Sequence, residues 1–417
     1  MRNEGCFNKN IYLEFFEKRL IFRIPHSSFL IKLFILFFFF QSCVGKSEEI
    51  KKIKVGAERT EIYLPLLKNK KVAIVSNQSS LIGKKHLVDS LLKLKINIVK
   101  IFCPEHGFRG KADAGEHVNS YTDKKTGLKV ISLFGKNKKA RKKDLKNIDI
   151  IIFDIQDVGV RFYTYTSTMH YMMESCSENN IQMLIFDRPN PNGFYVDGNI
   201  LDMKFKSFVG MHPVPIVHGL TIGEYAKMIN GEKWLKNGIK CDLKIIPCEN
   251  YTHKDLYELP IKPSPNLPNI SSIYLYPSLC LFEGTPISIG RGTDFPFQVF
   301  GHPSFKNDTF IFIPKITEGS KYPKFKNKKC FGFDLRKEKN NILNSKKINL
   351  SFLIESYKKF EKKGHFFKKF FSVLAGGKTL ENQIKKNLSE KEIRKTWEKD
   401  LRNFKILRKK YLIYEDF

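Results

Sequence analysis

Two short polar segments of this chain carry side chains whose types and spacing could do chemistry. In the first, Glu105 and His106 are followed three residues later by Arg109. A carboxylic acid beside Phe102 and Phe108 could lose its water contacts, which would raise the pKa of Glu105 and keep it protonated as a general acid. His106 could orient this acid or titrate on its own, and Arg109 could bind an anionic group with two parallel hydrogen bonds. The alternative for these residues is a surface turn with a salt bridge.

The second segment places Asp154, Gln156, Asp157 and Arg161 within eight residues, and Tyr163 follows closely. Paired carboxylates are typical of glycoside chemistry, and amide and tyrosine side chains suit sugar hydroxyl groups. The same carboxylates could instead bind a metal together with histidines. No HxH or HExxH spacing supports that alternative, so the segment favours glycoside chemistry without a metal or other cofactor.

Both segments follow short apolar runs, and two further runs end in polar clusters in the same way. Short apolar runs separated by helix-length segments are typical of parallel strands that are buried on both faces. Ligands of open α/β sheets bind outside the carboxyl ends of the strands. We therefore expect the two further clusters, Asn77 with Gln78 and Asp187 with Asn190, to face the same cleft. The alternative is that they serve only as turn and capping residues. The four runs are 71–76, 96–102, 148–153 and 182–186.

The pattern along the chain predicts an α/β domain over residues 71–270 and a smaller α+β domain over 271–417. Further strands are expected at 129–133 and 243–246, and helices at 139–147, 164–179, 221–229 and 390–411. Four prolines within residues 260–268 exclude a helix interior there and mark the boundary. Beyond it, residues 283–294 form another polar, Gly-rich cluster that contains Glu283 and Arg291.

The first 43 residues have the pattern of an export leader, and residues 44–70 would connect it to the first domain. Basic residues precede an apolar core at 33–40, which is too short to span a membrane, and Ser42 and Cys43 follow. This order resembles a bacterial lipoprotein processing site. We expect an exported protein that is anchored to the membrane by a lipid on Cys43.

Composition argues against several other classes of function. The formal net charge is +31, but the excess is mostly Lys spread from Lys51 to Lys410, which favours a solvated surface over a nucleic-acid footprint. No GxGxxG motif follows the first strand and no CxxC pair occurs, so neither a dinucleotide site nor a zinc ribbon is indicated.

Taken together, these clusters resemble the exo-β-N-acetylmuramidases of the NamZ (YbbC-like) family. The resemblance implies a Rossmann-like N-terminal domain, a smaller C-terminal domain with an active cleft between them, and release of N-acetylmuramic acid from the non-reducing end of peptidoglycan fragments. The family's central glutamate corresponds to Glu105, and the Lys-rich segment 319–347 departs from the family pattern. Two alternatives remain open, a metal-dependent hydrolase or deacetylase on the same sugars and a non-catalytic muropeptide-binding lipoprotein. The resemblance is carried by residues 76–78, 104–110, 154–165, 187–191, 283–285, 290–293 and 408–414.

Overall fold

The computed structural model describes residues 52–110, 116, 119–306 and 308–417, and Lys52–Phe417 forms one compact unit. The expected leader and the lipidation site Cys43 lie outside the described residues. Within the described part of the chain, no helix combines the length and the apolar character that crossing a membrane requires.

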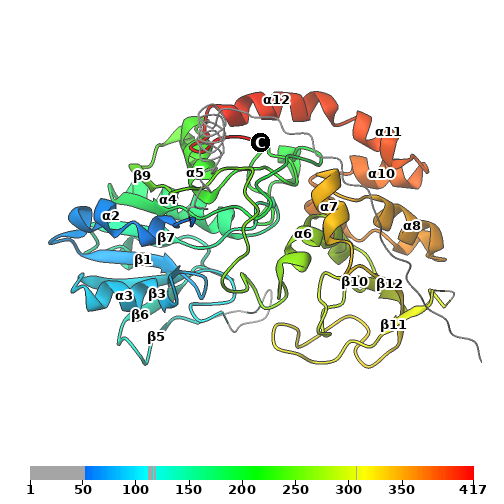
Figure 1. Ribbon diagram of the computed structural model, residues 1–417, viewed down its shortest axis with the longest axis horizontal. Coiled ribbons are helices and arrows are strands. Elements are labelled where there is room, and N and C mark those ends of the chain that lie inside the picture. The colour runs from blue at the N-terminus through cyan, green and yellow to red at the C-terminus, as the bar shows by residue number, and fades with distance from the viewer. Residues whose placement is uncertain (1–51, 111–115, 117–118, 307) are drawn as a thin grey trace, which may run out of the picture. The chain divides into compact units, whose positions relative to one another are not determined.

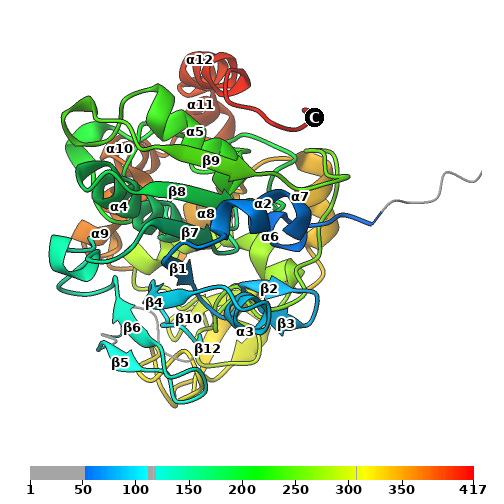
Figure 2. The same ribbon diagram turned by 90° about the vertical axis from the view of Figure 1, so that its left-hand side faces the viewer.

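A seven-stranded sheet forms the N-terminal half of this unit, with the strand order β5-β6-β4-β1-β7-β8-β9. Every neighbouring pair is parallel except β5 with β6. Figure 2 shows these strands stacked beside one another. The register pairs Ser76 with Asp154, so the segments that follow β1 and β7 begin side by side. The predicted parallel sheet is therefore confirmed. Its strands are β1 (Val72–Ser76), β4 (Ile98–Cys103), β5 (Tyr121–Thr122), β6 (Lys129–Ser132), β7 (Ile150–Asp154), β8 (Gln182–Phe186) and β9 (Leu243–Ile246).

Helices cover both faces of the sheet because its central strands are apolar on both sides. Along β1, Ala73 and Val75 belong to the apolar layer under α4 and α5, whereas Val72 and Ile74 belong to the layer under α2 and α3. Burying one such Val or Ile side chain stabilises the fold by about 1.5–3 kcal/mol. The bounds of these helices are α2 (Thr60–Leu67), α3 (Leu87–Lys93), α4 (Tyr165–Glu178) and α5 (Ile222–Gly231), and a small hairpin of β2 (Leu81–Ile82) and β3 (Lys85–His86) precedes α3.

Two of the predicted helices show how local side chains decide the outcome. The helix expected from Thr221 forms as α5, with the reciprocal hydrogen bonds of a capping box between Thr221 and Glu224. The helix expected at 139–147 is wrong, because only the 3₁₀ turn Lys142–Asp144 forms there. The Asp144 carboxylate accepts hydrogen bonds from the Arg141 backbone and side chain, and this local pairing competes with a continued helix.

The C-terminal half consists of helices around a small antiparallel sheet with the order β10-β12-β11 (Figure 1). The prediction of a smaller α+β part is confirmed, and the helix expected at 390–411 forms as two helices that are interrupted at Thr396 and Trp397. The exact boundary at residue 270 stays a prediction. The elements are α6 (Ile270–Leu279), β10 (Val299–His302), β11 (Phe310–Phe312), β12 (Cys330–Asp334), α7 (Lys339–Ser345), α8 (Ser351–Lys359), α9 (Lys369–Ala375), α10 (Thr379–Lys385), α11 (Glu390–Lys395) and α12 (Glu398–Lys409). Further 3₁₀ turns span Gly56–Glu58, Met203–Phe205, Lys236–Gly238, Cys280–Gly284 and Lys363–His365.

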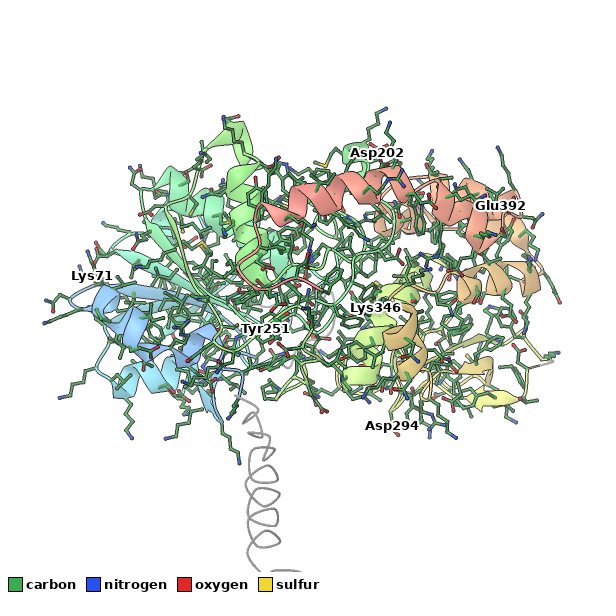
Figure 3. The ribbon with its side chains drawn as sticks, turned by 45° about the horizontal axis from the view of Figure 1, so that its top comes forward. Lys71, Asp202, Tyr251, Asp294, Lys346 and Glu392 are labelled. Atoms are coloured by element: carbon green, nitrogen blue, oxygen red, sulfur yellow. The ribbon has the colours of Figure 1, made fainter. Side chains whose placement is uncertain are left out.

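The last residues of the chain return to the large sheet. The Tyr414 hydroxyl donates to Asp187 Oδ2 at 2.7 Å, and the Ile413 amide donates to Glu224 Oε1 at 2.9 Å. The ring of Tyr251, which lies in the interior in Figure 3, packs edge-on against Tyr414 with 5.0 Å between centroids. The C-terminal tail is therefore part of the core that supports the ends of β8 and β9.

Candidate active site

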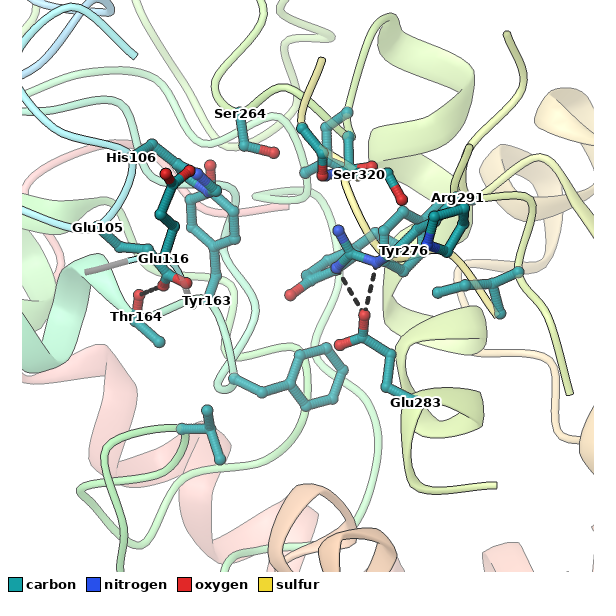
Figure 4. A pocket seen from close by; sticks show the side chains of 18 of the residues that line it. Glu105, His106, Glu116, Tyr163, Thr164, Ser264, Tyr276, Glu283, Arg291 and Ser320 are labelled. Atoms are coloured by element: carbon teal, nitrogen blue, oxygen red, sulfur yellow. Dashed lines mark hydrogen bonds and ion pairs between the residues drawn. The ribbon is translucent and has the colours of Figure 1, made fainter. Parts of the chain in front are cut away.

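A pocket of about 770 Å³ opens at the carboxyl ends of the strands. Its lining comes from the turn after β4, from the segment between β7 and α4, and from α6 with the loops that follow it (Figure 4). Residues from both halves of the sequence therefore share one cavity. Its polar lining residues include Glu105, His106, Glu116, Tyr163, Thr164, Tyr165, Ser264, Asn266, Tyr276, Glu283, Ser288, Arg291, Ser320, Lys321, Tyr322 and Lys324.

Glu105 enters this pocket from a tight turn directly after β4. The turn is closed by a hydrogen bond from the Gly107 amide to the Pro104 carbonyl at 3.1 Å, and His106 takes a positive φ of 70°. A positive φ is unfavourable for a residue with a Cβ atom, so tertiary contacts must hold His106 in place. The Thr164 hydroxyl donates to Glu105 Oε2 at 2.8 Å, as the dashed line in Figure 4 shows. Glu105 and His106 thus both line the pocket, as the sequence predicted.

The aromatic residues around Glu105 are different from those that the sequence suggested. Phe102 and Phe108 are fully buried in the two apolar layers of the sheet and do not line the pocket. Other aromatic side chains form the pocket wall. The buried ones are Phe162, Tyr163, Tyr165, Tyr276 and Phe297, of which Tyr163 and Tyr165 meet edge-on at 4.8 Å between ring centroids.

Across the pocket, Glu283 and Arg291 form an ion pair (Figure 4). Glu283 Oε1 accepts from Arg291 Nε at 2.8 Å and lies 2.5 Å from Nη2. The guanidinium also lies over the ring of Phe297, with 5.0 Å between its central carbon and the ring centroid. Within the described residues, Arg291 Nη1 makes no hydrogen bond, so one edge of the guanidinium is available to a ligand.

Lys324 holds the backbone near Glu283 through hydrogen bonds. Its ammonium donates to the carbonyl groups of Phe282, Thr285 and Ile287 at 3.1, 2.7 and 3.0 Å. Burial lowers the pKa of Lys324 to about 8, although the nearby Glu283 carboxylate opposes that change. Lys324 therefore fixes the loop that carries Glu283.

Asp154, which the sequence placed among the catalytic residues, lies outside the pocket lining. Its carboxylate is fully buried and receives two hydrogen bonds from Arg188, from Nε at 2.6 Å and from Nη2 at 2.9 Å. Arg188 also donates to the Leu81 carbonyl. A buried carboxylate whose oxygens are both held by a buried guanidinium braces the loops after β7 and β8 and is not accessible to a substrate.

Asp157, the other proposed catalytic aspartate, is also buried outside the pocket lining. Oδ2 accepts from the Gly159 amide at 2.6 Å, whereas Oδ1 has no partner among the described residues. Burial raises the pKa of Asp157 to about 7. A neutral carboxyl group fits this site better than a carboxylate, because an unpaired buried charge is costly.

Arg109 and Arg161, which the sequence predicted as binding residues in addition to Arg291, also have their partners elsewhere in the fold. Arg109 pairs with Asp123, with 2.9 Å between Nη2 and Oδ2, and lies over the ring of Phe108. Arg161 is buried, and among the described residues its guanidinium donates to backbone carbonyl groups, including those of Val214 and Ala375. Neither arginine lines the pocket, whereas Arg291 does.

The remaining predicted binding residues brace the loops at the sheet edge. Asn77 is hydrogen-bonded to a pocket residue, because its Nδ2 donates to the Tyr165 hydroxyl at 2.9 Å. Asp187 accepts from Thr221, Gly223 and Tyr414, and burial raises its pKa to about 6. The others donate to backbone carbonyl groups, Gln78 to Pro263, Gln156 to Pro189 and Asn190 to Leu220, at 2.9, 2.8 and 2.9 Å. Tyr163, in contrast, lines the pocket as predicted.

Sequence reasoning missed several residues of the pocket wall. Thr164 directly follows Tyr163 and lies at the N-cap of α4. Ser264 and Asn266 lie in the Pro-rich segment 260–268, whose composition predicts only a domain boundary. Tyr276 lies within the apolar helix α6 and had no sequence signal. The segment 319–324 belongs to the Lys-rich region that departs from the family pattern, yet it lines the pocket.

Within the described part of the chain, no three His, Cys, Asp or Glu side chains come together in a way that would hold a metal ion. The expected absence of a metal in the reaction stays a prediction.

Comparisons with known proteins cover almost all of the described chain. Residues 72–271 match the N-terminal domain of the exo-β-N-acetylmuramidase NamZ family, and residues 274–414 match its C-terminal domain. The chain is 38% identical over 392 residues to the peptidoglycan β-N-acetylmuramidase NamZ of Bacillus subtilis strain 168, covering 89% of this chain and 94% of that protein.

Two crystal structures of DUF1343 family proteins from Bacteroides fragilis NCTC 9343 share the fold. One has a TM-score of 0.82 and 49% sequence identity, and it covers 88% of this chain and 100% of its own. The second has a TM-score of 0.72 and 28% identity, with 87% and 99% covered. With both domains matched in order, this chain belongs to the exo-β-N-acetylmuramidase NamZ family.

Proposed function

We propose that this protein is a glycoside hydrolase that releases N-acetylmuramic acid from the non-reducing end of peptidoglycan fragments. The observation that carries the proposal is Glu105, a carboxylic acid held by Thr164 in a pocket to which both family domains contribute. The peptidoglycan β-N-acetylmuramidase of Bacillus subtilis, which is 38% identical over most of both chains, supports the same activity.

In this reaction Glu105 acts as the general acid. Its proton passes to the glycosidic oxygen as the bond from that oxygen to the anomeric carbon breaks, and a water molecule supplies the oxygen that replaces it. The hydrogen bond from Thr164 Oγ1 to Oε2 orients the Glu105 carboxyl group in the pocket. Positioned acid catalysis of this kind contributes about 10²–10⁴ to a rate.

Arg291 is the group that best explains a preference for muramic acid. The lactyl substituent of that sugar carries a carboxylate that N-acetylglucosamine lacks. Arg291 Nη1 has no hydrogen-bond partner in the part of the chain that the structure describes, and the pairing of Arg291 with Glu283 fixes the orientation of the guanidinium in the pocket. The tyrosine rings of the pocket wall give the sugar ring an apolar surface to pack against.

The direct test is to incubate the purified full-length chain with a chromogenic β-N-acetylmuraminide and with the matching β-N-acetylglucosaminide. We expect chromophore release from the muraminide and little from the glucosaminide. Binding of muropeptides without any turnover would instead favour the non-catalytic lipoprotein. Loss of turnover in EDTA that one divalent ion restores would favour the metal-dependent hydrolase.

We also propose that the protein is exported and attached to the membrane through a lipid on Cys43. The support is the order of basic residues, the apolar core at 33–40 and Ser42 before Cys43. Stable anchoring needs more than one acyl chain, as in the multiply acylated lipoprotein form. Mass spectrometry of the N-terminal peptide should find an acylated Cys43. An unmodified Cys43 with the upstream segment still attached would refute the anchor.

A further inference from the structure

The pocket wall includes one aromatic side chain that is turned toward solvent. Tyr322 lines the pocket, yet 95% of its surface is exposed. Phe370, another lining residue, is 43% exposed. The other aromatic residues of the wall, such as Tyr163 and Tyr276, are buried. The aromatic surface of the pocket therefore continues outward past its mouth.

The segment that carries Tyr322 is fixed on its N-terminal side. Thr317 and Ser320 exchange two backbone hydrogen bonds, at 3.2 and 3.0 Å, which close a tight turn. Gly319 has a φ of +84°, and a Cβ atom there would come within 2.4 Å of Pro265. Asn266 Nδ2 donates to the Gly319 carbonyl at 2.7 Å, which ties the turn to the pocket wall.

The residues on either side of Tyr322 are fixed as well. The Lys321 ammonium lies 2.6 Å from Glu116 Oε1. Lys324 Nζ is held by three backbone carbonyl groups, as described above. The exposed ring therefore extends from a braced segment. A group that is ordered before its ligand arrives loses less conformational entropy on binding.

The position of this ring matches the geometry of an exo-acting hydrolase. Such an enzyme encloses the terminal sugar at the reacting acid, and the rest of the glycan must leave through the pocket mouth. A pyranose ring presents an apolar face of C–H groups, and aromatic side chains of binding sites pack against such faces. An exposed tyrosine of the pocket lining is placed to contact that departing part of the substrate.

We propose that Tyr322 forms a stacking platform for the sugar that follows the terminal muramic acid, so that the enzyme selects glycan chains over simple muraminides. The inference rests on the proposed function. It assigns to Tyr322 the selection of a second sugar, whereas Glu105 donates the proton and Arg291 recognises the lactyl carboxylate. The platform lowers KM for substrates with a second sugar and leaves proton transfer unchanged.

The experiment compares Tyr322→Ala with the parent full-length chain on two substrates. One is the disaccharide of N-acetylmuramic acid linked to N-acetylglucosamine, and the other is trifluoroethyl β-N-acetylmuraminide, whose leaving group is too small to reach the ring. Loss of an aromatic contact of this kind should lower kcat/KM on the disaccharide about 3- to 10-fold, mainly through KM. The trifluoroethyl glycoside should be hydrolysed at the parent rate.

Two further variants make the result specific. Tyr322→Phe keeps the ring and should retain parent activity on both substrates. Tyr121→Ala removes a tyrosine that is 39% exposed on β5, outside the pocket lining, and should change neither rate.

An equal loss of Tyr322→Ala on both substrates, or no loss on either, would overturn the platform. A loss seen only when the glycan carries stem peptides would assign the ring to peptide binding and would also overturn it. If the parent chain hydrolyses neither substrate, the proposed function itself fails.

Discussion

The charged side chains that follow β4 and those at the ends of β7 and β8 are of similar types but have different roles. Glu105 and His106 line the pocket, whereas Asp154 and Asp187 are enclosed by partners from their own fold. Asp154 is held by Arg188, and Asp187 accepts from the hydroxyl groups of Thr221 and Tyr414. Polar residues at the carboxyl edge of this sheet are thus of two kinds, those that line the pocket and those that are buried outside its lining.

The largest expected effect tests Glu105, which lines the pocket. Glu105→Gln keeps the shape and the acceptor for Thr164 but removes the proton that is donated to the glycosidic oxygen. Hydrolysis of a glycan substrate should fall by about 10²–10⁴ in kcat with little change in thermal unfolding. Near-parent hydrolysis by this variant would exclude Glu105 as the general acid.

The next largest effect tests Asp154, whose carboxylate is buried with Arg188. Asp154→Ala leaves the buried guanidinium of Arg188 without a counter-charge and should lower the free energy of unfolding by about 3–5 kcal/mol. Urea unfolding should measure this loss of stability. The kcat per folded molecule, measured at low temperature, should remain at the parent value. The double variant Asp154→Leu with Arg188→Met removes both charges and should recover most of the stability. If instead the single variant folds normally and loses turnover, Asp154 is catalytic after all.

A smaller effect concerns recognition of the substrate. Arg291→Ala should reduce the preference for muraminide over glucosaminide substrates by about 1.5–3 kcal/mol, since one charge-assisted contact is lost. Arg109→Ala is the matched control, because Arg109 pairs with Asp123 outside the pocket. A preference that survives Arg291→Ala but not Arg109→Ala would reverse this assignment.

The smallest effect is a pH dependence that arises from Asp157. Burial raises the pKa of Asp157 from an ordinary 3.8 to about 7, so between these values the folded chain binds the proton more strongly than the unfolded chain. The contribution of Asp157 to stability should therefore be full below about pH 4 and decline as the pH rises toward 7. Urea unfolding at several pH values should show that Asp157→Asn lacks this decline. An identical pH profile in both proteins would mean that the pKa of Asp157 is the same in the folded and the unfolded chain.

The sequence predicted the sheet well because apolar runs of β-branched residues report burial directly. The runs that became β1, β4, β7 and β8 needed no knowledge of distant partners. The roles of Arg109, Arg161 and Asp154 could not be read in the same way. Each is decided by a contact with a residue far away in the chain or with a backbone carbonyl, such as that of Ala375 for Arg161. Tyr276 and the segment 319–324 reach the pocket only through tertiary packing, so their local sequence carries no sign of it.

The C-terminal tail has a consequence for how the chain comes to be folded. Glu224 and Asp187 belong to the domain of the large sheet, yet they receive hydrogen bonds from Ile413 and Tyr414, which follow them by 189 and 227 residues. Until these residues leave the ribosome, the sheet has buried carboxylates without some of their donors. Completion of the large domain therefore requires a segment that is synthesised long after its strands, and a nascent chain released before that segment would lack the donors that close its core.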